Sequence, residues 1–254
     1  MSAQSTTPDA LSAAIESLYA TFSKYPSRTH VEGCAHCTTD ADHAQLHSRP
    51  LRELQSADLK RFAFKALTTW GDNDDLRHFL PRIFELIVRD IKFPVDLEVV
   101  VGKLDYGEWQ TWPEAEQKAL RNYLYAVWGA ILSSSTFWIE ADTWLACLAR
   151  ANQSVQPALD LWVANTTLMS TARLVEFIDD NFATLTKKRM LGNAFIGGDS
   201  PAHREVLVWL MKPDTERRLE GCFFELKDEE LAEKISAAIE QLRCLREREL
   251  ERKN

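Results

Sequence analysis

The chain has 254 residues, 45% hydrophobic and 27% charged, which is enough for one large domain or two modest ones with a sizeable core. Its formal net charge of −8 disfavours a nucleic-acid partner, because phosphate contacts need a basic surface. The sequence has neither an apolar run long enough to span a membrane nor a secretory signal, so we expect no membrane partner and a cytoplasmic protein whose five cysteines stay reduced.

The N-terminal segment, residues 1–50, is expected to form one helix followed by a linker. An amphipathic helical pattern covers residues 8–24. After a loop, Thr38 or Thr39 can cap a short helix that ends near His47.

Two amphipathic helices joined by a tight turn follow this segment. Ser56 is a suitable N-cap for the first helix, and Gly71 ends it, since glycine is favoured just after a helix. Asp72 or Asn73 caps the second helix, and Pro81 inside it predicts a kink. Apolar residues at helical spacing line one face of each helix: Leu59, Phe62, Ala63, Ala66, Leu67 and Trp70, then Leu76, Phe79, Leu80, Ile83, Phe84 and Ile87.

Further helices account for most of the remaining chain. Residues 95–104 fit a helix or a strand, and we favour a helix because the neighbouring segments are helical. Thr111 and Glu114 form a capping box at the start of a long helix to about Leu132. Residues 206–211 are apolar all round and fit a central helix or a strand. Other predicted helices lie near 138–151, 155–170, 171–184, 201–212, 219–226 and 228–245.

These patterns together predict an all-α fold of about ten helices. Helix pairs at 56–90, 97–132 and 138–170 resemble stacked antiparallel hairpins, as in a HEAT-like right-handed array. The pairs share no residue-level repeat, so the analogy concerns architecture alone. We expect residues 51–254 to form one continuous helical body.

Two blocks of this region resemble a known group of sequences. The first reads HVEGCAHC from His30, and the second reads RPLRELQSADLKRFAFKALTTWGDNDDLRHFLPR and ends at Arg82. Together they are similar to a group of bacterial all-helical proteins to which no activity is assigned. The resemblance implies a bacterial cytosolic helical protein and brings no functional residue with it.

The densest chemistry lies in residues 30–47, which hold four of the six histidines and two of the five cysteines. A Cys-x-x-Cys pair followed by a His-x-x-x-His pair predicts a tetrahedral zinc site. The predicted ligands are Cys34, Cys37, His43 and His47, with His30 or His36 as substitutes. Substitutes are considered because only five residues separate the two pairs, where a zinc finger uses about twelve.

Two alternatives to zinc remain open for this window. The cysteines can pack as small apolar groups while the histidines are solvated. A redox pair is the other alternative, although no βαβ pattern surrounds it.

An aromatic loop forms a second candidate site. Tyr106, Trp109 and Trp112 are of the residue types enriched at interface hot spots, so we predict that they bind a protein partner. The same side chains can instead anchor the loop beneath the adjoining helices.

A third cluster lies at the start of the second helix of the tight pair. Its members are Asp72, Asp74, Asp75, Arg77 and His78. Carboxylates and a histidine can bind a divalent ion or exchange protons. Acidic residues at a helix N-terminus are explained more simply by capping and by the helix dipole.

No catalytic sequence motif is present. We therefore expect a non-enzymatic scaffold or protein–protein interaction module, in which zinc would at most be a structural clip. The alternatives are a metal-dependent enzyme with an open site, and a regulator that responds to metal or redox state through Cys34 and Cys37.

Overall fold

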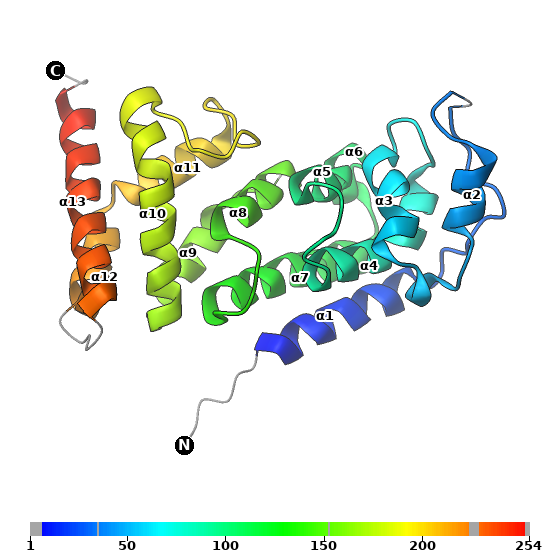
Figure 1. The fold of residues 1–254 in the computed structure, drawn as a ribbon, viewed down its shortest axis with the longest axis horizontal. Helices are drawn as coiled ribbons and strands as arrows, with labels where there is room; N and C mark the ends of the chain where they lie inside the picture. Colours follow the sequence, from blue (N-terminus) through cyan, green and yellow to red (C-terminus); the bar gives the residue numbers. More distant parts are fainter. Residues whose placement is uncertain (1–6, 35, 152, 224–228, 252–254) are drawn as a thin grey trace. The chain divides into compact units, whose positions relative to one another are not determined.

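The computed structural model describes residues 7–34, 36–151, 153–223 and 229–251, and the elements of its fold over these ranges are all helices (Figure 1). The predicted all-α class is confirmed, whereas the HEAT-like stacking stays a prediction. The α-helices are α1 (Thr7–Phe22), α2 (Asp40–Leu46), α3 (Ser56–Lys65), α4 (Asn73–Arg89), α5 (Leu97–Val101), α6 (Lys103–Tyr106), α7 (Glu114–Ser133), α8 (Ala141–Arg150), α9 (Gln156–Ala164), α10 (Leu168–Lys188), α11 (Pro201–Leu210), α12 (Pro213–Phe223) and α13 (Glu229–Glu251). Two 3-10 helices are η1 (Leu51–Glu53) and η2 (Trp109–Thr111).

The chain divides into two compact units, each described here by itself. The first unit ends at Ala130 and also includes Arg150 and Ala151. The second unit contains Ile131–Ala149 and the described residues from Gln153 onwards. We expected a division near residue 50 instead. The difference arises because α1 packs along α4, which makes the N-terminal helix part of the core of the first unit.

Apolar packing between α1 and α4 forms much of the first unit's core. Ile15, Leu18 and Phe22 of α1 are each no more than 2% exposed. Burying one such side chain stabilises the fold by about 2 kcal/mol. Tyr19 adds a polar link, because its hydroxyl donates to Glu85 Oε2 at 2.6 Å.

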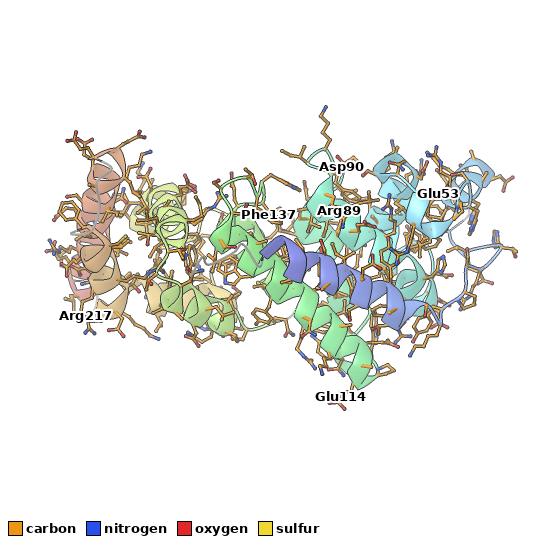
Figure 2. All side chains as sticks on the ribbon, turned by 90° about the horizontal axis from the view of Figure 1, so that it is seen from below. Glu53, Arg89, Asp90, Glu114, Phe137 and Arg217 are labelled. Atoms are coloured by element: carbon orange, nitrogen blue, oxygen red, sulfur yellow. The ribbon has the colours of Figure 1, made fainter. Side chains whose placement is uncertain are left out.

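Charged side chains lie on the outside of each unit with few exceptions, among them Glu85 and Glu116 of the first unit. Glu53 of η1 and Glu114 of α7 project from the first unit, and Arg217 of α12 projects from the second (Figure 2). This division between apolar interior and charged exterior is the one that the helical periodicity predicted.

The first helix of the predicted pair is shorter than expected. Helix α3 ends at Lys65, whereas the apolar spacing predicted a helix through Trp70. Leu67 adopts a left-handed φ of 62°, and the chain turns back there. Tertiary hydrogen bonds explain the difference. The Gly71 N–H donates to the Glu32 carbonyl oxygen at 2.7 Å, and this contact replaces the hydrogen bonds of a further helical turn.

The structure confirms two of the predicted N-caps and differs from the prediction at two others. Thr39 caps α2 and Asp72 caps α4, as predicted. The N-cap of α3 is Gln55, because the Ser56 hydroxyl donates to Asp90. Thr111 does not cap α7: it closes η2, and its hydroxyl donates to the Glu108 carbonyl oxygen at 2.8 Å.

The two segments with ambiguous patterns are both helical. Residues 95–104 contain α5 and the start of α6, and residues 206–211 form the end of α11 and its C-cap, Met211. The helix predicted over 219–226 is seen as the end of α12, and its last residues lie outside the described ranges.

The second unit is built around three neighbouring helices. Helices α10 and α13 lie side by side and run in the same direction, and α12 packs against α13 (Figure 1). Leu174 and Ile178 of α10 and Ile235 and Leu242 of α13 are almost fully buried. Because α10 and α13 are in contact with each other, the side chains that border this contact on both helices are held in fixed positions.

Candidate functional site

Cys34 and Cys37 are the first and last residues of a hydrogen-bonded turn that precedes α2. The N–H groups of Cys37 and Thr38 donate to the Cys34 carbonyl oxygen at 2.8 and 3.0 Å. The Cys34 N–H donates to the Thr69 carbonyl oxygen at 2.9 Å, which ties the turn to the segment after α3. Cys34 is exposed and Cys37 is partly exposed, so the turn presents two neighbouring thiols at the surface.

Two cationic side chains lie at the Cys37 end of the turn. Arg61 Nη2 donates to the Cys37 carbonyl oxygen at 3.0 Å, and Lys65 Nζ makes a short contact with the same oxygen. The pKa of Cys34 lies below its ordinary value, chiefly because the backbone of His36 and the side chain of Cys37 hydrogen-bond to its sulfur, with a smaller effect of the Lys65 charge. A lowered pKa increases the thiolate fraction, which is the nucleophilic form.

The histidines of the window pack on one another and on aromatic rings. The rings of His30 and His43 are stacked with their centroids 4.5 Å apart, and His43 meets Trp70 edge-on at 5.2 Å. Burial, and then the charges of His43, His78 and His30, lower the pKa of His47. Both effects favour the neutral form of the His47 imidazole.

The predicted zinc ligands are not gathered into one site. Among the residues that the structure describes, no group of three or more His, Cys, Asp or Glu side chains is placed to hold a metal ion. His43 packs against Trp70 and His47 lies beside Phe79, while His36 is exposed. Zinc binding stays a prediction, for which only the cysteine turn is preformed.

The aromatic loop is not an exposed surface. Trp109 and Trp112 are 0% and 3% exposed, so the expectation that they face a partner is wrong. Their indole N–H groups donate to the carbonyl oxygens of Ala151 and Gly107, each at 2.8 Å. Among the three predicted partner-binding residues, Tyr106 alone is exposed, at 58%.

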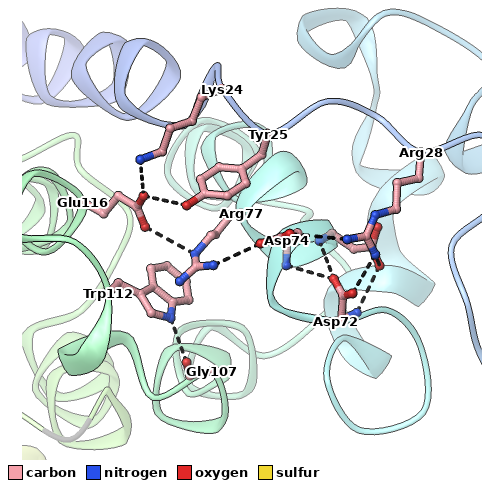
Figure 3. Close-up of polar contacts among 10 residues, drawn as sticks. Lys24, Tyr25, Arg28, Asp72, Asp74, Arg77, Gly107, Trp112 and Glu116 are labelled. Atoms are coloured by element: carbon pink, nitrogen blue, oxygen red, sulfur yellow. Dashed lines mark hydrogen bonds and ion pairs between the residues drawn. The ribbon is translucent and has the colours of Figure 1, made fainter.

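The acidic cluster caps α4 and binds the segment after α1. Asp72 Oδ1 accepts hydrogen bonds from the N–H groups of Asp74 and Asp75 at 2.9 and 3.1 Å. Arg28 Nη1 lies 2.6 Å from Asp72 Oδ2 (Figure 3). His78 Nδ1 lies 2.8 Å from a backbone carbonyl oxygen. These contacts account for the cluster by capping and packing.

A buried carboxylate links the same segment to α7. Lys24 Nζ and the Tyr25 hydroxyl each lie 2.7 Å from Glu116 Oε1, and Arg77 Nε lies 3.3 Å from Glu116 Oε2 (Figure 3). The Arg77 guanidinium also stacks over the Trp112 ring at 4.3 Å. The sequence pattern did not reveal this network, because its members come from three separate segments.

A groove in the second unit was also missed by the sequence patterns. It lies between the start of α8, α10 and α13 and has a volume of about 660 Å³. We call it the α10–α13 groove. Its apolar residues are Ala141, Ala172, Val175, Phe177, Leu231 and Ala237. Its charged residues are the carboxylates Glu140, Asp142, Glu176, Asp179 and Asp180 and the cations Arg173 and Lys234.

The α10–α13 groove is therefore an apolar surface with an acidic border. Both cations contact groups of the chain: Arg173 reaches Glu176 and a backbone carbonyl oxygen, and Lys234 lies 2.7 Å from Glu230. Burial, and then the charges of Asp179 and Glu176, raise the pKa of Asp180. Carboxylates that repel one another in this way gain from a cation placed between them.

One sequence signal points to part of this groove. Glu176, Asp179 and Asp180 recur at helical spacing beside apolar positions of α10. The other two sides of the groove come from α8 and α13, which no local pattern places next to α10.

Comparisons with protein-family models, with curated proteins and with solved structures found no match to this chain. Over the described ranges, none of the helices has the length and apolar character needed to cross a membrane.

Proposed function

We propose that this protein is a protein-interaction module whose α10–α13 groove binds a basic, amphipathic segment of a partner. The observation that carries the proposal is the apolar groove surface beneath an acidic border. An amphipathic helix binds in this way when its apolar face enters a groove and its charged face meets the border. The proposal places the module in the cytoplasm.

Charge selects a basic partner over an acidic one. Five carboxylates border the groove, and its two cations already contact acceptors within the chain. Lysine or arginine side chains of a partner would relieve the repulsion that raises the pKa of Asp180. Opposite charge also speeds encounter between partners, and this effect weakens as salt concentration rises.

Two labelled peptides test the preference directly. The first has about 18 residues, or five helical turns, with leucine on one face and lysine on the other. The second keeps the leucines and replaces every lysine with glutamate. Fluorescence anisotropy with the full chain should show binding of the lysine peptide and none of the glutamate peptide. Equal binding of the two peptides would contradict the proposal.

Charge reversal locates the binding to the groove. The double variant Glu140→Lys with Asp180→Lys reverses two border charges and should weaken binding of the lysine peptide by at least about tenfold. The matched control is Glu233→Lys with Glu247→Lys, which reverses two exposed charges of α13 outside the groove. If both double variants weaken binding equally, the attraction comes from overall charge and the groove is not the site.

A third variant tests shape without changing charge. Ala237→Trp fills the groove from an exposed position of α13, so the fold should tolerate it while the peptide is excluded. Undiminished binding to this variant would place the peptide elsewhere on the protein.

A further inference from the structure

We propose that Cys34 and Cys37 form a reversible dithiol–disulfide site, in which Cys34 reacts first and Cys37 closes the disulfide. This site lies in the first unit and is independent of the proposed groove in the second. Its basis is the turn that holds the two thiols together, and the cationic side chains beside it.

The turn already satisfies the geometry that a disulfide needs. A hydrogen bond of 2.8 Å from the Cys37 N–H to the Cys34 carbonyl oxygen closes a turn of four residues. The Cα atoms at the ends of such a turn lie within about 7 Å of each other, and disulfides bridge Cα atoms about 4.4–6.8 Å apart. Closure therefore needs rotation of two side chains and little movement of the backbone.

Accessibility and charge assign the order of the two thiols. Cys34 is exposed, whereas Cys37 is partly covered. Lys65 Nζ contacts the Cys37 carbonyl oxygen at the end of the turn, so a positive charge lies beside the pair. Cys34 is thus the thiol that a dissolved oxidant meets first.

The chemistry proceeds by exchange with a small-molecule disulfide, of which oxidised glutathione is an example. The Cys34 thiolate attacks one sulfur, forms a mixed disulfide and releases one glutathione thiolate, which takes up a proton. Cys37 loses its proton and attacks the Cys34 sulfur, and the second glutathione leaves as a thiol. In total, two cysteine thiols are oxidised by two electrons and one glutathione disulfide is reduced to two thiols.

Mass spectrometry of the full chain treated with oxidised glutathione tests the closure. The expected product has lost two hydrogens, with the new bond within the peptide that contains both cysteines, and a reductant restores the starting mass. A mixed disulfide that persists on Cys34 of the unmutated protein would overturn the proposal. Cys37→Ser should convert the reaction to such a persistent mixed disulfide, because the closing thiol is removed.

Other cysteines of the chain provide internal controls for reactivity. Cys222 and Cys244 are also partly exposed, but neither is part of a two-cysteine turn. Cys34 should react with iodoacetamide at least about tenfold faster than either. Equal rates at the three sites would overturn the assigned order.

A lysine pair on α3 tests the role of the neighbouring charge. Lys65→Gln should slow the reaction of Cys34 by about threefold or more, and Lys65→Arg should restore it. Lys60→Gln, at an exposed position of the same helix, is the matched control and should have no effect. If Cys34 becomes reactive only after a chelator removes bound zinc, the pair is a metal clip and the proposal fails.

Discussion

Glu116 shows how one buried charge holds separate segments of the first unit together. Its side chain is 0% exposed and contacts Lys24, Tyr25 and Arg77. Removing one member of a buried charged group leaves its partners without compensation. We expect Glu116→Ala to lower the free energy of unfolding by about 3 kcal/mol, measured by urea denaturation.

The neighbouring residue Lys118 provides the control for this prediction. It is exposed on the same helix, so Lys118→Ala should change the free energy of unfolding by no more than about 0.5 kcal/mol. If Glu116→Ala also changed the free energy of unfolding by no more than about 0.5 kcal/mol, water would be replacing the lost carboxylate as the partner of Lys24, Tyr25 and Arg77. The network would then add little to stability.

At the scale of elements, the connection between α3 and α4 depends on Gly71. Its φ of 73° is left-handed, and a Cβ there would lie 3.1 Å from atoms of Asp75 and Phe62. We expect Gly71→Ala to lower the free energy of unfolding by about 2 kcal/mol or more, because backbone strain and crowding add together. Thermal or urea denaturation followed by circular dichroism measures the effect.

A second glycine of the same unit should respond in the opposite direction. Gly129 lies within α7, and a Cβ there would meet no atom within 4 Å. Alanine favours helix over glycine, so Gly129→Ala should raise the stability by about 0.5–1 kcal/mol. If both substitutions destabilise equally, conformation and space are not what distinguishes the two positions.

The same elements show what sequence patterns could and could not establish. Local chemistry determined the caps Thr39 and Asp72 and the helical periodicity, and these predictions are confirmed. The end of α3 depends instead on hydrogen bonds to residues more than 30 positions earlier in the chain, such as that between Gly71 and Glu32. A pattern read along one helix contains no information about such a contact.

The candidate sites follow the same rule at the scale of the whole chain. The Cys34–Cys37 pair was visible in the sequence because its geometry is that of one local turn. The exposure expected of Trp109 and Trp112 was wrong, since burial is decided by tertiary packing. The α10–α13 groove could not be predicted, because three helices from distant parts of the sequence form it.

A partly buried histidine in the first unit and a buried one in the second give each unit a dependence on pH. Burial lowers the pKa of His47 in the first unit, and the charges of His43, His78 and His30 act in the same direction. Burial is also the largest cause that lowers the pKa of His203 in the second unit, where His203 is 2% exposed. Each folded unit therefore binds a proton less readily than the unfolded chain, whose histidines have a pKa of about 6.5.

A histidine whose pKa is lower in the folded protein than in the unfolded chain costs no stability while it is neutral in both states. As pH falls, the unfolded chain binds the proton first, and the fold is destabilised relative to it. The contribution of His47 and His203 is thus complete above about pH 6.5 and is lost as pH falls through that value towards the lower folded pKa values. We expect the urea midpoints to fall between about pH 7.5 and 5.5. The double variant His47→Gln with His203→Gln should reduce this fall, whereas His36→Gln, at an exposed position, should preserve it. An unchanged fall in the double variant would assign the pH dependence to the carboxylates instead.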